Sequence, residues 1–211
     1  FWSWIASLAH TSVAASVLLV NLHPVVIVAG SALWLGERTT RAQLVGLAVA
    51  LVGAAILAMA SPGSESSPNV ALGNTLALVG AVTVGLYYLA GRSLRQRLSL
   101  WPYVGLVYGA CLLSLLAFAA VDGTVLLGYE RREWLLFAGI ALGPMLIGHT
   151  GFNWSLRYVP AFVVSLAVLA EPVGAALLAY AIPAISETPT PAVLIGGAVV
   201  LVGLGLGVRR T

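Results

Sequence analysis

Two ionisable side chains stand directly before prolines in apolar stretches of the chain, His23 before Pro24 and Glu171 before Pro172. Proline lacks an N–H and clashes with the carbonyl four residues earlier, so each pair predicts a kinked helix with one freed carbonyl. A glutamate and a histidine in apolar surroundings can exchange a proton with each other or with an amine. The alternative is structural, because either side chain could instead donate a hydrogen bond to the freed carbonyl and stabilise the kink.

Further polar side chains recur at helical spacing. His149 and Asn153 are four residues apart, as are Ser12 and Ser16, so each pair shares one helix face. Such a face should line a cavity or contact a neighbouring helix, and hydrogen bonds between helices explain the serines equally well. Aromatic rings more often pack or anchor helices than line a pathway. The candidate residues of a substrate or proton pathway are Glu171, His23, His149, Asn153, Ser16, Tyr87 and Trp154.

The elements that position these groups must lie in lipid. Of the 211 residues, 60% are hydrophobic and only 8% are charged, which cannot cover a water-soluble surface. Runs of about 20 uncharged residues can cross a hydrocarbon core of about 30 Å as helices, and they lack the alternation of barrel strands. We predict an all-α polytopic membrane protein with seven complete transmembrane helices, preceded by a partial one at residues 1–9. The predicted spans are 11–35, 40–60, 71–91, 100–121, 134–156, 159–183 and 191–208.

An internal repeat relates two parts of the chain. Ser155 and Pro172 follow Ser7 and Pro24 at one offset, since 155 − 7 and 172 − 24 both give 148. The predicted helices cross the membrane five times between Ser7 and Ser155, and an odd number places the two copies in opposite orientation, as in many carriers. Further matches follow at an offset of 150, in which Glu37, Thr40, Gly46 and Gly53 correspond to Glu187, Thr190, Gly196 and Gly203.

The repeat predicts an inverted pair of five-helix halves. Because the second copy has about 85 residues before Ser155 and the first has six before Ser7, we expect about 80 further residues before residue 1. Residues 1–60 would be the remainder of the first repeat, with the end of its third helix and its fourth and fifth helices. Residues 61–70 would be an external linker, and residues 71–208 the complete second repeat.

Four glycines are candidates for close helix packing. Gly46 and Gly53 are seven residues apart, as are Gly196 and Gly203, so each pair lies on one helix face. Small residues on a face let two helix backbones approach closely within a membrane. We therefore predict that these glycines pack helices together.

Residues just before two of the spans are interpreted as helix starts. Thr40 and Gln43 form a T-x-x-Q capping box, and Thr190 precedes Pro191 at the matching place. Glu37, like its repeat mate, carries a negative charge that suits the nearby amide groups of a helix start. Helix capping is the interpretation that we favour for both glutamates.

The arginines predict the orientation in the membrane. All ten basic residues are arginines, and only Arg131 and Arg132 fall on one side when the sides alternate from span to span. This positive-inside bias predicts a cytoplasmic C-terminus and an external linker at 61–70. The eight arginines on the predicted cytoplasmic side are Arg38, Arg41, Arg92, Arg95, Arg97, Arg157, Arg209 and Arg210.

Three stretches resemble the EamA-type carriers of the drug/metabolite transporter superfamily. They run from Ser7 to Pro24, from Leu35 through Gly46, and from Glu171 through Gly203, so that the resemblance covers essentially the whole chain. It implies ten helices, cytoplasmic termini and a central cavity between the halves, and it names no substrate. Residues 184–187 depart from the leucine-glycine-glutamate turn that the family has there.

The sequence predicts a secondary transporter and no enzyme. It would export small metabolites such as amino acids, or amphipathic drugs, across the cytoplasmic membrane by alternating access, with proton exchange as the energy source. A nucleophile elbow, a paired-histidine metal helix and a phosphate-binding glycine loop are all absent from the sequence, so we predict no metal or cofactor. Its partners would be the small-molecule substrate, protons and lipid, without nucleic acid; the oligomeric state stays open. The main alternative is a membrane partner or sensor that transports nothing, and a membrane-embedded enzyme is the less favoured one.

Overall fold

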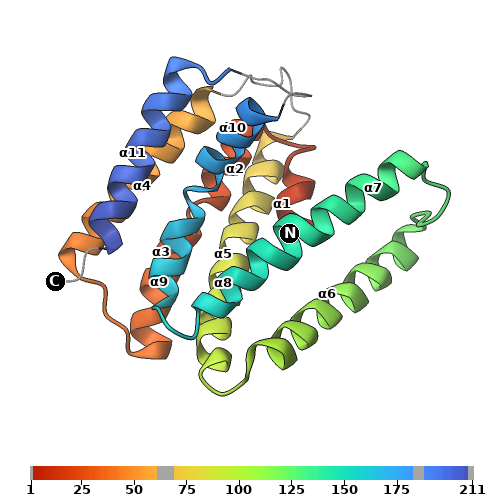
Figure 1. The fold of residues 1–211 in the computed structure, drawn as a ribbon, viewed down its shortest axis with the longest axis horizontal. Coiled ribbons are helices and arrows are strands. Elements are labelled where there is room, and N and C mark those ends of the chain that lie inside the picture. Colours follow the sequence, from red (N-terminus) through yellow and green to blue (C-terminus); the bar gives the residue numbers. More distant parts are fainter. Residues whose placement is uncertain (1, 61–68, 183–187, 209–211) are drawn as a thin grey trace. The chain divides into compact units, whose positions relative to one another are not determined.

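The computed structural model describes residues 2–60, 69–182 and 188–208, which are helical and contain no strand (Figure 1). Seven helical segments in these ranges are long and apolar enough to cross a membrane. The prediction of a polytopic all-α membrane protein with seven complete spans is therefore confirmed. The spans are Val13–Leu35, Arg41–Ala60, Val70–Arg95, Leu100–Asp122, Arg131–Ser155, Ala161–Ala181 and Pro191–Val208.

Three of the spans consist of shorter pieces, and four are continuous helices. The short helix α1 (Trp2–Ser7) precedes them. The continuous helices are α4 (Arg41–Ala60), α5 (Val70–Arg95), α6 (Leu100–Asp122) and α11 (Pro191–Val208). The interrupted spans are α2 (Val13–Val20), α3 (His23–Gly30) and the π-helix η1 (Ser31–Leu35); α7 (Arg131–Ile140), the π-helix η2 (Ala141–His149) and α8 (Thr150–Ser155); and α9 (Ala161–Val168) with α10 (Glu171–Ala181).

The chain forms two compact units, one of Phe1–Ala90 with Pro160–Thr211 and one of Gly91–Val159. These units do not follow the predicted repeats, because helices from both repeats pack together within the first unit. Residues 61–68 of the predicted linker, Glu187, Arg209 and Arg210 lie outside the described residues.

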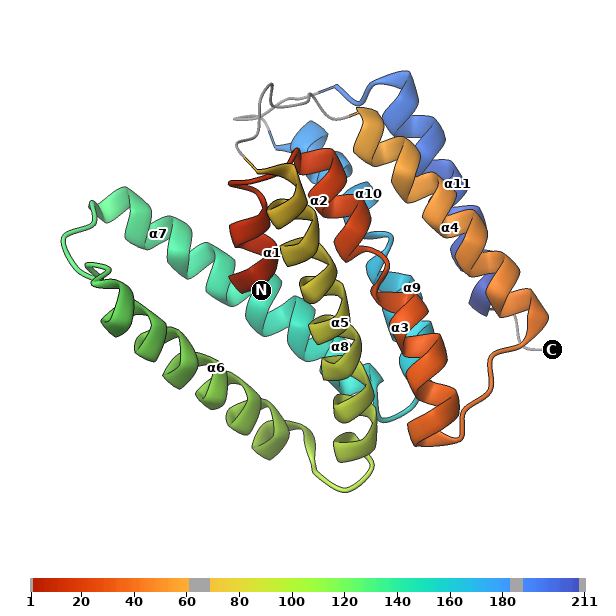
Figure 2. The ribbon, with the colours of Figure 1, turned by 180° about the vertical axis from the view of Figure 1, so that it is seen from behind.

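Within the first unit, α4 and α11 run side by side along their whole length (Figures 1 and 2). A Cβ atom added to Gly203 would lie 2.7 Å from the carbonyl oxygen of Gly46, and one added to Gly53 would lie 2.7 Å from that of Gly196. Both distances are shorter than real Cβ contacts, so the two backbones touch. The helices are antiparallel, since an early glycine of α4 meets a late glycine of α11.

The pairing of these glycines is crossed with respect to the repeat. Gly46 corresponds to Gly196 in sequence, yet it packs against Gly203, and Gly53 packs against Gly196. A two-fold axis brings residue i of one copy against residue j of the other and residue j against residue i. The packing of α4 on α11 therefore follows the pattern of an inverted repeat around such an axis.

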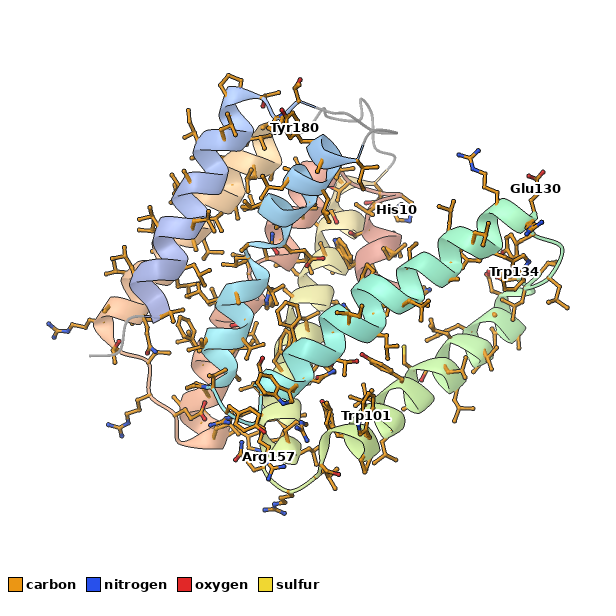
Figure 3. The ribbon with its side chains drawn as sticks, in the orientation of Figure 1. His10, Trp101, Glu130, Trp134, Arg157 and Tyr180 are labelled. Atoms are coloured by element: carbon orange, nitrogen blue, oxygen red, sulfur yellow. The ribbon has the colours of Figure 1, made fainter. Side chains whose placement is uncertain are left out.

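In the second unit, α6 forms a long hairpin with α7, η2 and α8. Trp101 and Arg157 lie at one end of this hairpin, and Glu130 and Trp134 lie at the other (Figure 3). The Tyr108 hydroxyl of α6 donates a hydrogen bond to the carbonyl of Met145 at 3.0 Å. That carbonyl belongs to η2, whose internal Pro144 lacks the N–H of a regular helix.

Candidate functional site

The two broken spans of the first unit repeat the same backbone geometry. The N–H of Leu22 bonds to the carbonyl of Leu19 at 3.2 Å, and 148 residues later (170 − 22) the N–H of Ala170 bonds to that of Ala167 at 3.0 Å. Each turn ends one helix and starts the next with proline among its first two residues. The repeat found in the sequence therefore has a counterpart in hydrogen bonding, and His23 and Glu171 each begin a half-helix.

His23 is almost fully buried, with 2% of its surface exposed. Its Nδ1 lies 3.1 Å from the carbonyl oxygen of Val20, which is the carbonyl that Pro24 deprives of a helical donor. The other ring nitrogen, Nε2, is buried and has no hydrogen-bond partner in the described part of the chain. His23 is thus tied to its own kink through one nitrogen.

Glu171 differs from His23, its repeat mate, because its side chain makes no hydrogen bond to the carbonyl at its own kink. Its side chain is exposed on the described chain. In residues 2–60, 69–182 and 188–208, its carboxyl group forms no hydrogen bond or ion pair, either with the carbonyl of Val168 or with His23. The kink at Pro172 therefore forms without the help of this side chain, which stands at the positive end of the α10 dipole.

Ser16 holds two helices together. It is fully buried, and its Oγ lies 2.6 Å from the Oγ of Ser7 at the end of α1. Ser7 in turn donates to the carbonyl of Trp4 at 2.6 Å. Ser12 precedes α2 as its N-cap residue and so does not share a helix face with Ser16. Its Oγ accepts a hydrogen bond from the N–H of Ala15 at 3.1 Å. This arrangement corresponds to the structural alternative for the serines.

Tyr88, which the sequence analysis did not single out, lies close to His23. Tyr88 is 2% exposed, and its ring centroid lies 6.1 Å from that of His23. Tyr87 is half-buried, and its ring is tilted by 55° against that of Tyr88 with 5.2 Å between ring centroids. A helical stripe of small buried residues on α5 includes Ala77 and Ala81 and continues to Tyr88, so this periodicity could have identified it.

The three remaining candidates belong to the second unit and point in different directions. Asn153 is completely buried, whereas Trp154 is 52% exposed and packs on Tyr158 with ring centroids 4.8 Å apart. His149 is half-buried and meets Phe152 edge to face at 6.3 Å. Asn153 and Trp154 are neighbours in sequence and therefore cannot line the same face of α8.

Three side chains at the end of α5 hold the end of α8: those of Arg92, Arg95 and Gln96, whose amide donates to the carbonyl of Arg157 at 3.1 Å. Arg95 is 1% exposed, and its Nε donates to the carbonyl of Asn153 at 2.9 Å. Arg92 donates to the carbonyls of Leu156 at 2.8 Å and Arg157 at 3.0 Å. Cations suit the negative end of a helix. Arg92 and Arg95, which the sequence analysis interpreted only as orientation signals, are thus also structural.

Replacing Arg95 with alanine should lower the free energy of unfolding by about 3 kcal/mol. Besides the bond to Asn153, its guanidinium donates to the carbonyl of Leu98, and each hydrogen bond to a charged group contributes roughly 1.5–3 kcal/mol. Unfolding by SDS in detergent micelles would measure the change. Arg97→Ala is the matched control, because Arg97 is exposed in the same turn. Equal losses in the two variants would contradict the structural role of Arg95.

The comparisons with known proteins agree on a family. The model of the EamA-like transporter family matches residues 1–59 and 71–208. An uncharacterized transporter of Archaeoglobus fulgidus is 27% identical over 208 residues, which are 99% of this chain and 72% of that protein. A probable terminal-alkyne amino-acid exporter of Streptantibioticus cattleyicolor is 30% identical over 210 residues, which cover 96% of this chain and 66% of the exporter.

A solved crystal structure has the same fold, with a TM-score of 0.82 at 24% sequence identity over 98% of this chain and 71% of that one. At this identity the likeness supports the fold alone. The family match covers both the first-repeat residues and the second-repeat residues, including both broken spans. The chain therefore belongs to the EamA-like transporter family.

Proposed function

We propose that the chain contributes to a secondary transporter that exports small amino acids by alternating access and is driven by proton exchange at Glu171. The observation that carries this proposal is the contrast between the repeat mates. The ring of His23 bonds to the carbonyl freed by Pro24, while the carboxyl of Glu171 makes no bond in the described chain. An ionised carboxylate near the centre of a membrane-spanning helix costs about 2.5–3.5 kcal/mol, so a structural partner or a function must offset its presence.

The position of Glu171 also suits a transported ligand. Transporters often bind their solutes at helices that are interrupted near the bilayer centre. Glu171 opens α10 after such an interruption, and it is the only acidic residue in that span, Ala161–Ala181. Its carboxylate could bind the ammonium group of an amino acid, and its protonated form could release that group.

Amino acids are proposed as the substrate class on two grounds. The name of the Streptantibioticus cattleyicolor relative describes a terminal-alkyne amino-acid exporter. In addition, none of the arginines of this chain lies in the middle of a span, so a strongly anionic solute would find no cluster of cations there. Amphipathic cations are the second class that we would include in a test.

Orientation and domain division are proposed together with this function. Residues 1–60 form part of a first repeat and residues 71–208 a second, inverted one, with the C-terminus in the cytoplasm. Within the second unit, Arg92, Arg95 and Arg157 gather at one end of the hairpin, and Arg131 begins a helix at the other. This distribution supports a cytoplasmic location for the first end.

Transport in proteoliposomes tests the proposal. Vesicles with an imposed pH gradient and a trapped pH-sensitive dye would receive L-norvaline, propargylglycine (a terminal-alkyne amino acid) or tetraphenylphosphonium. We expect saturable uptake of the amino acids together with proton movement in protein-containing vesicles and none in empty vesicles. Uptake of tetraphenylphosphonium alone would reassign the substrate class, and the absence of flux for all three solutes would overturn the transporter proposal.

A further inference from the structure

A cavity of about 260 Å³ lies where the first span ends and α9 begins, entirely within the first unit. Its lining does not include either kink, and the sequence analysis interpreted its glutamate as a helix cap. The volume is slightly below the range of about 300–1,000 Å³ of drug-sized ligand pockets. A ligand that filled it would therefore be small. The cavity is lined by Ser31, Glu37, Arg38, Thr39, Gln43, Pro160 and Phe162.

The local backbone explains why polar side chains gather around this cavity. Gly36 ends η1 in the left-handed conformation, with φ of 68°, and the N–H of Glu37 then bonds to the carbonyl of Ser31 at 3.1 Å. The chain enters α4 through the capping box, in which the N–H of Thr40 donates to the Gln43 Oε1 at 2.8 Å and the N–H of Gln43 to the Thr40 Oγ1 at 3.2 Å. The segment between these two fixed ends lines the cavity.

The cavity presents both signs of charge. Glu37 is half-buried and Arg38 is exposed at the rim, so an anionic and a cationic group lie next to each other. A guanidinium group binds a carboxylate through two parallel hydrogen bonds, and a carboxylate binds an ammonium group. The two side chains together are neutral, which favours a ligand that itself carries one charge of each sign.

Ser31 supplies an independent indication of a ligand. It is 1% exposed, lines the cavity, and its Oγ is buried without a hydrogen-bond partner among the described residues. Leaving a buried hydroxyl unbonded costs about 1–3 kcal/mol, which a bound polar ligand would recover. Phe162, 2% exposed, forms an apolar wall that suits a short aliphatic side chain.

We propose that this cavity binds a free α-amino acid as a zwitterion before the amino acid reaches Glu171. Arg38 binds its carboxylate, Glu37 its ammonium group, and Ser31 a second polar atom of either group. The proposal rests on the proposed function for the choice of ligand and for the cytoplasmic position of the loop at residues 36–40. It assigns a loading site at one end of the two interrupted spans, away from the breaks at Pro24 and Pro172.

Binding of three related probes to the purified protein in detergent tests the charges one at a time. L-norvaline carries both charges, L-norvalinamide lacks the carboxylate, and N-acetyl-L-norvaline lacks the ammonium group. Calorimetry should show that Arg38→Gln weakens norvaline binding at least tenfold and leaves norvalinamide binding unchanged. Glu37→Gln should weaken norvaline binding similarly and leave the binding of the N-acetyl compound unchanged.

Matched variants separate this effect from a loss of folding. Arg41→Gln removes an exposed arginine that does not line the cavity, and it should bind norvaline like the unaltered protein. Ser31→Ala should weaken norvaline binding about threefold while the SDS unfolding midpoint stays the same. The loading site is overturned if Arg38→Gln and Arg41→Gln behave alike, or if both singly charged probes bind as tightly as norvaline.

The same preparations distinguish failure of the loading site from failure of the transporter proposal. If the Arg38 and Glu37 variants transport norvaline in proteoliposomes as fast as the unaltered protein, the transporter proposal stands and the loading site is refuted. Binding that follows the predicted pattern, without any flux, would retain the site and refute the transporter proposal.

Discussion

Gly203→Leu should lower the free energy of unfolding by about 3 kcal/mol, at the upper end of the usual cost of overpacking. The first atom of the new side chain would lie 2.7 Å from the carbonyl oxygen of Gly46 and 2.8 Å from the Cα of Ala50. Both are backbone atoms of α4, so no side-chain rotation can make room. The helices would have to separate along a contact that extends from Gly46 to Gly196, and the SDS unfolding midpoint in micelles would report the loss.

Gly205→Leu is the matched control, since Gly205 lies two residues further along the same helix with no atom within 4 Å of its Cβ position. Both variants make the same change in size and hydrophobicity, and only one of them meets α4. We therefore expect Gly205→Leu to leave the midpoint within about 0.5 kcal/mol of the unaltered protein. If the two substitutions were equally harmful, the loss would reflect the poor fit of leucine in α11, and the close packing of α4 on α11 would be refuted.

The spans could be predicted from the sequence because lipid imposes a simple requirement on a helix. A run of about 20 apolar residues satisfies it almost irrespective of their order, and the arginines and the Ser/Pro/Gly linker separate one run from the next. The helix breaks before Pro24 and Pro172 could be predicted equally well, because proline acts on its own backbone neighbours. Properties that depend on one residue and its nearest neighbours along the chain could thus be predicted from the sequence.

The directions of side chains were harder to predict, since they depend on the number of residues per helical turn all along a span. Regular α-helical spacing was assumed for the whole fifth span, but its middle is the nine-residue π-helix η2 (Ala141–His149), in which each turn holds more residues. The faces of residues before η2 therefore shift relative to those of α8, such as that of Asn153. Nothing in the local sequence announces this π-helix except Pro144, which is compatible with several kinds of distortion.

Burial of a charged residue depends on contacts made across the fold. Arg95 and Arg97 look alike in sequence, yet Arg95 is buried under the end of α8 and Arg97 is exposed. The bond from Arg95 to Asn153 joins residues 58 positions apart, which a single sequence without its fold cannot indicate. The spacing of Arg92, Arg95 and Gln96 does place them on one helix face, and this was the one signal that could have suggested a shared role.

Glu171→Gln should abolish proton-coupled amino-acid flux, a loss of at least a hundredfold, while norvaline still binds to the purified protein. Glutamine keeps the size of the side chain and removes the proton that the proposed mechanism transfers. Since the Glu171 carboxyl makes no bond within the described chain, folding should be unaffected. Dye-monitored proton movement in proteoliposomes would measure the loss. Glu171→Asp, which retains a carboxyl group, should restore part of the flux.

His23→Asn is the decisive companion variant, because the repeat mates are expected to differ. An asparagine amide can still donate to the carbonyl of Val20, which is the bond that the structure assigns to His23. We therefore expect this variant to keep proton-coupled flux within about fivefold of the unaltered protein. Loss of coupling in His23→Asn together with full coupling in Glu171→Gln would move the proton site to the histidine, and the freedom of the Glu171 carboxyl would then have no bearing on transport.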